Sequence, residues 1–104
     1  MLDSAAMTFS GGSYDEIERW LRNFLSSHAK RENYRAEIEL DAGDEREGKS
    51  YDARLRLGDQ RVAVGEFDYK TVADHRGELS WCRDLAERIR GVVREQSRSP
   101  VRNA

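Results

Sequence analysis

The stretch that decides the fold is SYDARLRLGDQRVAVGEFDY, residues 50–69. In its first half, apolar and polar side chains alternate, which is the pattern of a strand with one buried face. Gly58 and Asp59 separate this run from a second one, and a two-residue turn with glycine first is typical of a β-hairpin. The second run alternates up to Val64, and its apolar positions shift by one after Gly65. An extra residue produces such a shift, so we expect a β-bulge at Gly65.

The segment before this hairpin alternates in the same way and predicts a third strand. In NYRAEIELDAG, residues 33–43, charged side chains point to one face and apolar side chains to the other. The inward positions are Tyr34, Ala36, Ile38 and Leu40. One register places Glu39 opposite Arg54. The same register places Glu37 opposite Arg56, and opposite charges that face each other favour it.

A helix is predicted before the strands, over residues 14–28. It begins with SYDE, a capping box in which Ser13 and Glu16 each satisfy a free backbone amide of the other. Behind this box, apolar residues recur at helical spacing. They are Ile17, Trp20, Leu21, Phe24 and Leu25, and His28 continues the same side.

A second helix is predicted after the strands. Its apolar side recurs with the helical period and consists of Leu79, Cys82, Leu85, Ala86, Ile89, Val92 and Val93. We expect this helix to begin between Val72 and Gly77, with Asp74 as its N-cap. It should end near Glu95 or Gln96, because the segment SRSPVRNA beyond it contains a proline.

These elements predict an α+β fold of α-β-β-β-α order, a three-stranded antiparallel meander with both helices packed on one face. Each helix has one apolar side and the sheet has one apolar face, so these surfaces should cover one another. The chain has 104 residues, which fits a single domain. We place the domain at residues 13–96, with a flexible lead at residues 1–12 and a flexible tail at residues 97–104.

The composition favours a folded protein of a reducing compartment. The net charge is −2, so bulk charge indicates no polyanionic partner. Cys82 is the single cysteine and cannot form an internal disulfide, which favours the cytoplasm. No apolar run approaches the roughly 20 residues that span a bilayer, so no membrane partner is expected.

A catalytic site is the third of three functional hypotheses. DYKTVADHRGELSWC, residues 68–82, gathers many reactive side chains in a short stretch. An enzyme would pair His75 with a nearby carboxylate and use Cys82 as its nucleophile. However, Cys82 falls within the apolar side of the predicted helix, and a buried lone cysteine is usually a small apolar residue. We therefore interpret the stretch as a strand end, a helix cap and the first helical turns, and predict no catalytic residue.

No metal or cofactor site is predicted. The two histidines, His28 and His75, are far apart in sequence, and the chain has no CxxC or HxxxH spacing. DAGDEREGKSYD, residues 41–52, is acidic but lacks the alternating ligand order of a calcium loop. SGGS, residues 10–13, lacks the lysine and the preceding strand of a P-loop.

Nucleic-acid binding is the second hypothesis. Four arginines fall on one side of the predicted final helix, namely Arg76, Arg83, Arg90 and Arg94. The order of elements is similar to that of double-stranded RNA-binding domains, which implies an RNA partner. Those domains use a lysine cluster at the start of the last helix and a histidine in the loop between the first two strands. In this chain the start of the last helix carries the acids Asp74 and Glu78, and the loop between the first two strands, AGDEREGK, is also acidic. Both contact points would therefore repel phosphate.

Protein interaction is the preferred hypothesis. Trp81 lies at the edge of the apolar side of the final helix, near Arg88, and Trp20 lies beside that of the first helix. Both rings could simply seal the contact between the helices. An exposed ring would mark a partner surface, because tryptophan and arginine are enriched in interface hot spots. We therefore expect a small interaction module without catalytic activity, and a homodimer is its plainest form.

Overall fold

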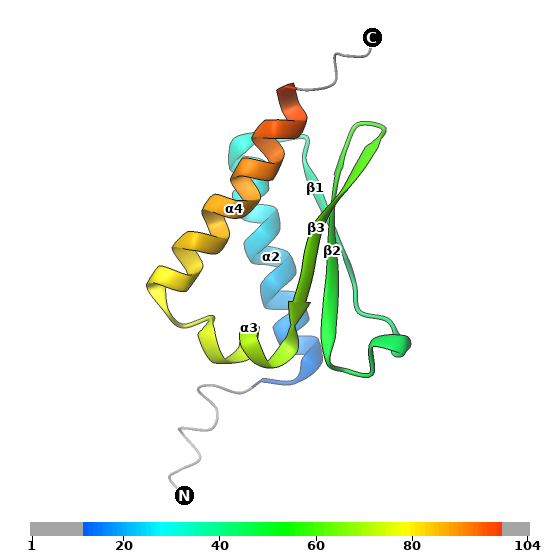
Figure 1. The fold of residues 1–104 in the computed structure, drawn as a ribbon, viewed down its shortest axis with the longest axis vertical. Coiled ribbons are helices and arrows are strands. Elements are labelled where there is room, and N and C mark those ends of the chain that lie inside the picture. The colour runs from blue at the N-terminus through cyan, green and yellow to red at the C-terminus, as the bar shows by residue number, and fades with distance from the viewer. Residues whose placement is uncertain (1–11, 99–104) are drawn as a thin grey trace, which may run out of the picture.

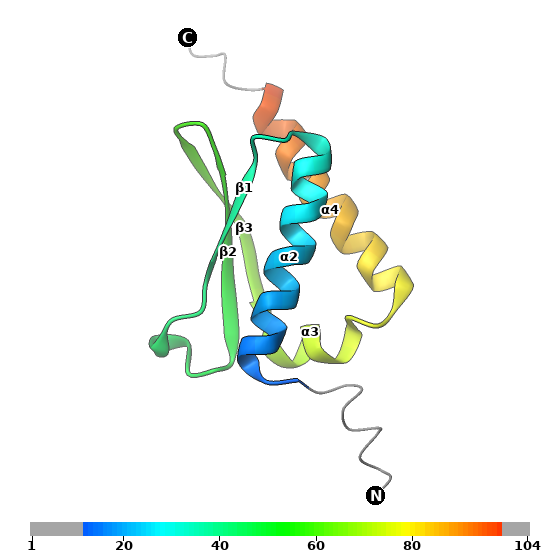
Figure 2. The same ribbon diagram turned by 180° about the vertical axis from the view of Figure 1, so that it is seen from behind.

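The computed structural model describes residues 12–98. The elements are α2 (Tyr14–Glu32), β1 (Glu37–Asp41), the 3-10 turn η1 (Asp44–Arg46), β2 (Ser50–Leu57), β3 (Gln60–Asp68), α3 (Tyr69–His75) and α4 (Leu79–Arg98). The strands form an antiparallel sheet in the order β1-β2-β3. In both views, α2 and α4 lie on the same side of this sheet (Figure 1, Figure 2). The predicted α+β meander with two helices on one face is confirmed, and the structure adds the short helix α3.

The core lies between the sheet and the two long helices. Helix α2 begins with the predicted capping box at Ser13 and Glu16, and it continues past the predicted end to Glu32. It packs on β1 and on α4, so both helices share one core. The largest fully buried side chains are Tyr51, Ile17, Leu21, Leu25, Leu55, Ile89, Val72 and Val93. The predicted lead and tail lie almost entirely outside the described residues, so their flexibility stays a prediction.

The register of the first hairpin is as predicted. Glu39 pairs with Arg54, and Glu37 pairs with Arg56. The ion pairs differ from the pairing of residues in the register. Arg56 contacts both glutamates, Glu37 at 2.5 Å and Glu39 at 3.2 Å. Arg54 instead contacts Asp52 of its own strand at 3.3 Å. The charges therefore support this register through one shared arginine.

The bulge predicted at Gly65 is confirmed. Gly65 pairs with Ala53 and Ala63 pairs with the next residue of β2, which leaves Val64 as the extra residue of β3. Gly65 has a φ of 146°, a conformation that side chains with a Cβ rarely adopt. The extra residue changes which side of the strand faces the core, so Val64 and Phe67 are both buried.

The final helical region begins differently from the prediction. Asp68 is an N-cap, because its side chain accepts a hydrogen bond from the amide of Thr71 at 3.1 Å and so starts α3. Asp74 lies inside α3, so its predicted role as the N-cap is wrong. A turn at Gly77 interrupts the helix before α4 begins, consistent with the low helix propensity of glycine. Helix α4 then runs to Arg98, past the predicted end of the domain at residue 96.

Two apolar residues that the periodicity placed in the core are exposed. Tyr34 is 81% exposed, because it lies in the turn before β1. Leu79 is 77% exposed and is the first residue of α4. The start of α4 is the part of that helix farthest from the sheet (Figure 1). Tyr34 lies before the strand that carries the alternating pattern, whereas Leu79 belongs to α4 but lies at its exposed first turn.

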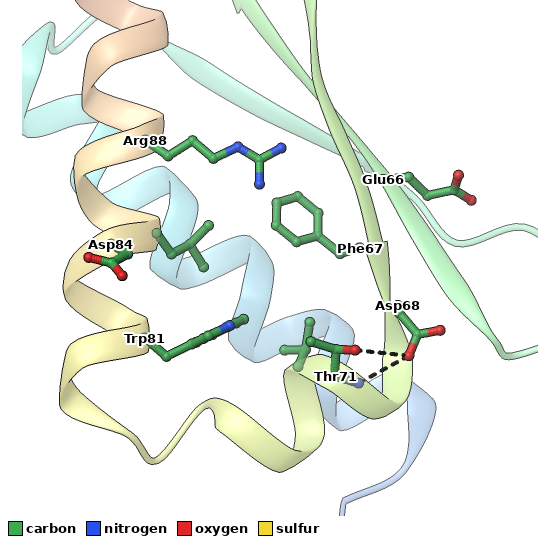
Figure 3. A pocket seen from close by; sticks show the side chains of 9 residues that line it. Glu66, Phe67, Asp68, Thr71, Trp81, Asp84 and Arg88 are labelled. Atoms are coloured by element: carbon green, nitrogen blue, oxygen red, sulfur yellow. Dashed lines mark hydrogen bonds between the residues drawn. The ribbon is translucent and has the colours of Figure 1, made fainter.

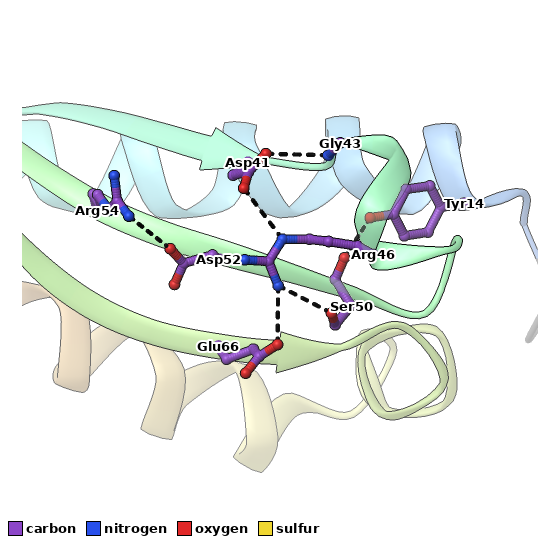
Figure 4. A network of polar contacts seen from close by, with 8 residues as sticks. All are labelled: Tyr14, Asp41, Gly43, Arg46, Ser50, Asp52, Arg54 and Glu66. Atoms are coloured by element: carbon purple, nitrogen blue, oxygen red, sulfur yellow. Dashed lines mark hydrogen bonds and ion pairs between the residues drawn. The ribbon is translucent and has the colours of Figure 1, made fainter.

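Arg46 ties the acidic loop between β1 and β2 to the sheet (Figure 4). Its guanidinium lies 3.3 Å from the carboxylate of Asp41 and 3.0 Å from that of Glu66. It also donates a hydrogen bond to the hydroxyl of Ser50 at 3.2 Å. One arginine of the acidic loop therefore connects all three strands.

Alkaline pH is expected to destabilise the fold through Tyr51. The ring is fully buried and the hydroxyl donates a hydrogen bond to the carbonyl of Tyr14 at 2.8 Å. Burial raises the pKa of Tyr51 above its ordinary value of 10.0. The unfolded chain therefore loses this proton first, and the free energy of unfolding should fall as the pH rises above about 10. Urea titrations at about pH 8 and about pH 11 measure the difference.

Tyr51→Phe should remove a large part of this alkaline loss, because phenylalanine has no proton to lose. At neutral pH it should cost about 1 kcal/mol for the missing hydrogen bond. Tyr34→Phe is the matched control, since Tyr34 is exposed and its removal should leave the alkaline loss unchanged. An equal alkaline loss in the wild type and in Tyr51→Phe would contradict this account.

Candidate functional site

A pocket of about 380 Å³ opens between the end of β3, helix α3 and the first half of α4 (Figure 3). Its wall combines apolar groups with charged ones. The lining residues are Glu66, Phe67, Asp68, Thr71, Val72, Trp81, Asp84, Leu85 and Arg88. This is the size of a cavity that accepts a single large side chain or a small molecule.

Three features of the chain position these side chains. The bulge at Gly65 turns Phe67 inward, and Asp68 ends β3 and caps α3. Trp81 and Arg88 are about two helical turns apart on α4, so both project from the same side of that helix. Figure 3 shows both side chains pointing from α4 toward the end of β3 and the start of α3. The pocket therefore exists because a strand irregularity and a helix side meet.

Arg88 is fixed against the edge of β3. Its Nη2 donates a hydrogen bond to the carbonyl of Val64, the bulge residue, at 3.0 Å. Its Cζ lies 5.3 Å from the centre of the Phe67 ring, within the range of a cation–π contact. A Cβ at position 65 would lie 2.4 Å from Nη2 of Arg88, so the glycine makes room for the guanidinium. Gly65, Phe67 and Arg88 thus act as one unit.

Trp81 belongs both to the pocket and to the contact between the helices. It is half-buried, and its ring lies 6.4 Å from that of Trp20 and 5.9 Å from that of His75. Trp20 in turn stacks on Phe24 at 5.0 Å. The structure therefore brings Trp81 and Arg88 together at the pocket, whereas Trp20 lies behind Trp81 and does not line it.

Carboxylates surround the pocket at its rim. Glu66 and Asp68 point away from the ring of Phe67, and Asp84 points away from the sheet (Figure 3). All three are exposed. The wall therefore combines apolar side chains with the guanidinium of Arg88 and the hydroxyl of Thr71, while the exposed acids make the rim negatively charged. Phe67 and these acids were not predicted as site residues, although the shift of the apolar pattern after Gly65 indicated that Phe67 faces inward.

His75 lies beside a carboxylate but outside the pocket just described. Its Nδ1 lies 3.1 Å from the carboxylate of Glu78, and its ring stacks on Trp81. Neither His75 nor Glu78 lines the pocket of Figure 3. The pair sits at the partly exposed turn between α3 and α4, and Nδ1 of His75 has no hydrogen-bond partner among the described residues.

Cys82 is half-buried, so its predicted place in the core is wrong. It lines a second depression of about 400 Å³, between α2 and α4, which His28 also lines. Its thiol donates a weak hydrogen bond to the carbonyl of Arg76 at 3.3 Å. Burial raises the pKa of the Cys82 thiol, and burial lowers the pKa of His28. Both groups are therefore neutral near pH 7, and the thiol lacks the anionic form that attacks an electrophile.

The four arginines of the nucleic-acid hypothesis do not form one open face. Arg90 and Arg94 both contact Glu32 of α2, at 3.3 Å and 3.1 Å. The hydrogen bond from Arg94 is the largest cause that lowers the pKa of Glu32, and the hydrogen bond from Arg90 lowers it further. Arg76 is the C-cap residue of α3 and so lies outside α4. Arg83 lines the second depression, beside Cys82.

Among the side chains that the structure describes in residues 12–98, which exclude that of Asp44, no three His, Cys, Asp or Glu residues come together in a way that could hold a metal ion. Over the same range, no helix combines the length and the apolar character that crossing a membrane requires.

The comparisons with known proteins add no relative. No protein-family model matches the chain, and neither the curated proteins nor the solved structures contain a match.

Proposed function

We propose that this protein is a small interaction module without catalytic activity, which binds a protein partner by receiving an apolar side chain in the pocket of Trp81 and Arg88. The observation that carries the proposal is that a half-buried tryptophan and an arginine, which donates a hydrogen bond to the carbonyl of Val64, line one pocket together. Tryptophan and arginine are enriched in interface hot spots. The hydrogen bond from Arg88 to the carbonyl of Val64 and the contact of Trp81 with Trp20 position both side chains before a partner binds, which lowers the entropic cost of binding.

We also propose that the module is cytoplasmic and that it can associate with a second copy of itself. The single cysteine forms no internal disulfide, and we place the module in the cytoplasm for that reason. A second copy of the chain is one candidate partner, and light scattering at two concentrations tests it. The ion pairs of Arg90 and Arg94 with Glu32 weigh against RNA as the partner, because phosphate would have to compete with a carboxylate.

Trp81→Ala is expected to weaken partner binding by about tenfold or more. The probe is a phage-displayed library of random peptides of about ten residues, selected on the wild-type protein and depleted on Trp81→Ala. Enriched peptides should bind the wild type in fluorescence titrations and bind the variant at least about tenfold more weakly. The physical reason is the loss of one pocket wall, against which the anchoring side chain packs.

Leu79→Ala is the matched control for this selection. Leu79 is also an apolar residue of the first half of α4, but it is exposed and does not line the pocket. Its variant should bind the selected peptides as the wild type does. Far-UV circular dichroism establishes that Trp81→Ala is folded, and Trp81→Phe serves as a milder second variant. The proposal fails if no peptide is enriched or if enriched peptides bind wild type and Trp81→Ala equally.

A further inference from the structure

The pocket lies beside an unpaired strand edge. In the sheet order β1-β2-β3, β3 stands at one edge, and no other strand of residues 12–98 pairs with its outer side. An edge strand offers free backbone N–H and C=O groups, to which an extended peptide can add as a further strand. Three of the pocket residues, Glu66, Phe67 and Asp68, are the last three of β3 itself. The pocket and the free edge therefore form one continuous surface.

Resting on the proposed function, we infer that the partner binds as an extended segment added to the end of β3, with an apolar residue between two basic ones. Side chains of an added strand alternate between the two faces of the sheet, as those of β3 do. Phe67 is buried on the inner face, whereas Glu66 and Asp68 are exposed on the outer side. The residue beside Phe67 enters the pocket, and its two neighbours lie beside these acids.

Charge complementarity selects lysine or arginine at the two neighbouring positions. Arg46 donates to Oε2 of Glu66 at 3.0 Å, and Thr71 donates to Oδ2 of Asp68 at 3.1 Å. Both side chains are exposed, and the contacts found among the described residues involve only Oε2 of Glu66 and Oδ2 of Asp68. Opposite charges on neighbouring strands stabilise their pairing, and like charges oppose it. The exposed carboxylate of Asp84 adds to the negative rim on the side of α4.

Arg88 limits the length of edge that a partner can use. Its hydrogen bond to the carbonyl of Val64 occupies the edge at the bulge, and bulges interrupt regular pairing. The added strand is therefore short and pairs with residues 66–68, next to the pocket. A short pairing segment supplies few backbone hydrogen bonds, so the side chain in the pocket carries much of the affinity.

Synthetic peptides with blocked ends test this inference. The probe is Thr-Val-Lys-Leu-Lys-Val-Thr, whose leucine is the anchor between two lysines, and the comparison peptide has both lysines replaced by glutamate. The lysine peptide should bind the wild-type protein about tenfold more tightly than the glutamate peptide. Glu66→Gln should reduce this binding about two- to fivefold. Glu47→Gln is the control, because Glu47 is an exposed acid of the β1–β2 loop and does not line the pocket.

Backbone methylation separates strand addition from other modes of binding. In an added strand, every second amide of the peptide faces β3 and donates a hydrogen bond to it. We therefore compare two variants of the lysine peptide. One is N-methylated at the amides of both lysines, and the other is N-methylated at the amides of both valines and the leucine. One set abolishes binding and the other leaves it within about twofold. Equal effects of the two sets, equal binding of the glutamate peptide, or no binding of either peptide overturns the inference. Peptides selected from the random library that depend on Trp81 would still support the proposed function in that event.

Discussion

Ile89→Ala is expected to lower the free energy of unfolding by about 3 kcal/mol. Ile89 is fully buried in the core cluster that α4 shares with α2 and the sheet. The substitution removes apolar atoms and leaves a cavity that the surrounding side chains fill only in part, because protein interiors are closely packed. Urea unfolding followed by far-UV circular dichroism measures the change.

Leu79→Ala is the matched control on the same helix. Leu79 is 77% exposed, so its truncation should change the free energy of unfolding by no more than about 0.5 kcal/mol. The helical period places both residues on the apolar side of α4, and only burial distinguishes them. Similar losses for the two variants would contradict the packing of α4 described above.

Gly65→Ala is expected to lower the free energy of unfolding by about 2 kcal/mol. The φ of 146° lies in a region that residues with a Cβ rarely adopt, so alanine strains the backbone. The new Cβ would also lie 2.4 Å from Nη2 of Arg88, which must move away from the carbonyl of Val64. Because Arg88 and Phe67 shape the pocket, the variant should also weaken binding of peptides selected on the wild type.

A double-mutant cycle with Arg88→Ala separates the two causes. Arg88 has a flexible side chain whose far end can move at low cost, whereas the backbone strain remains in any background. The loss caused by Gly65→Ala should therefore shrink by less than about 1 kcal/mol when Arg88 is alanine. If the loss disappears in that background, the contact with the guanidinium, and not the φ of Gly65, decides the effect.

Local pattern was enough to define the sheet and the first helix. The alternation of residues 50–57, the turn at Gly58 and the shift after Gly65 predicted the hairpin of β2 and β3 and its bulge. The opposite charges of Glu37 and Glu39 and of Arg54 and Arg56 predicted the register of β1 against β2. Each of these features depends on neighbouring residues and on the direction of their side chains, which a sequence shows directly. The capping box at Ser13 located the start of α2 for the same reason.

Competing local signals were not resolved by pattern alone. Both Asp68 and Asp74 suit an N-cap, and the choice depends on where β3 ends and lets the chain turn. Leu79 and Ile89 share one helical side, but the start of α4 diverges from the sheet while its middle packs against the core. Burial is a property of the whole arrangement of elements, so periodicity predicts the side of a helix without predicting how much of it is covered.

The candidate site required the tertiary structure. Trp81 and Arg88 were named from the sequence as one pair on a helix, but Phe67, Glu66 and Asp68 come from a strand that α3 separates from that helix. Their meeting depends on the angle between α4 and β3 and on the room that Gly65 leaves for a guanidinium. The sequence determines which side chains face inward along each element. Only the packing of the elements decides which of those side chains share a pocket, because that depends on contacts between residues far apart in the chain.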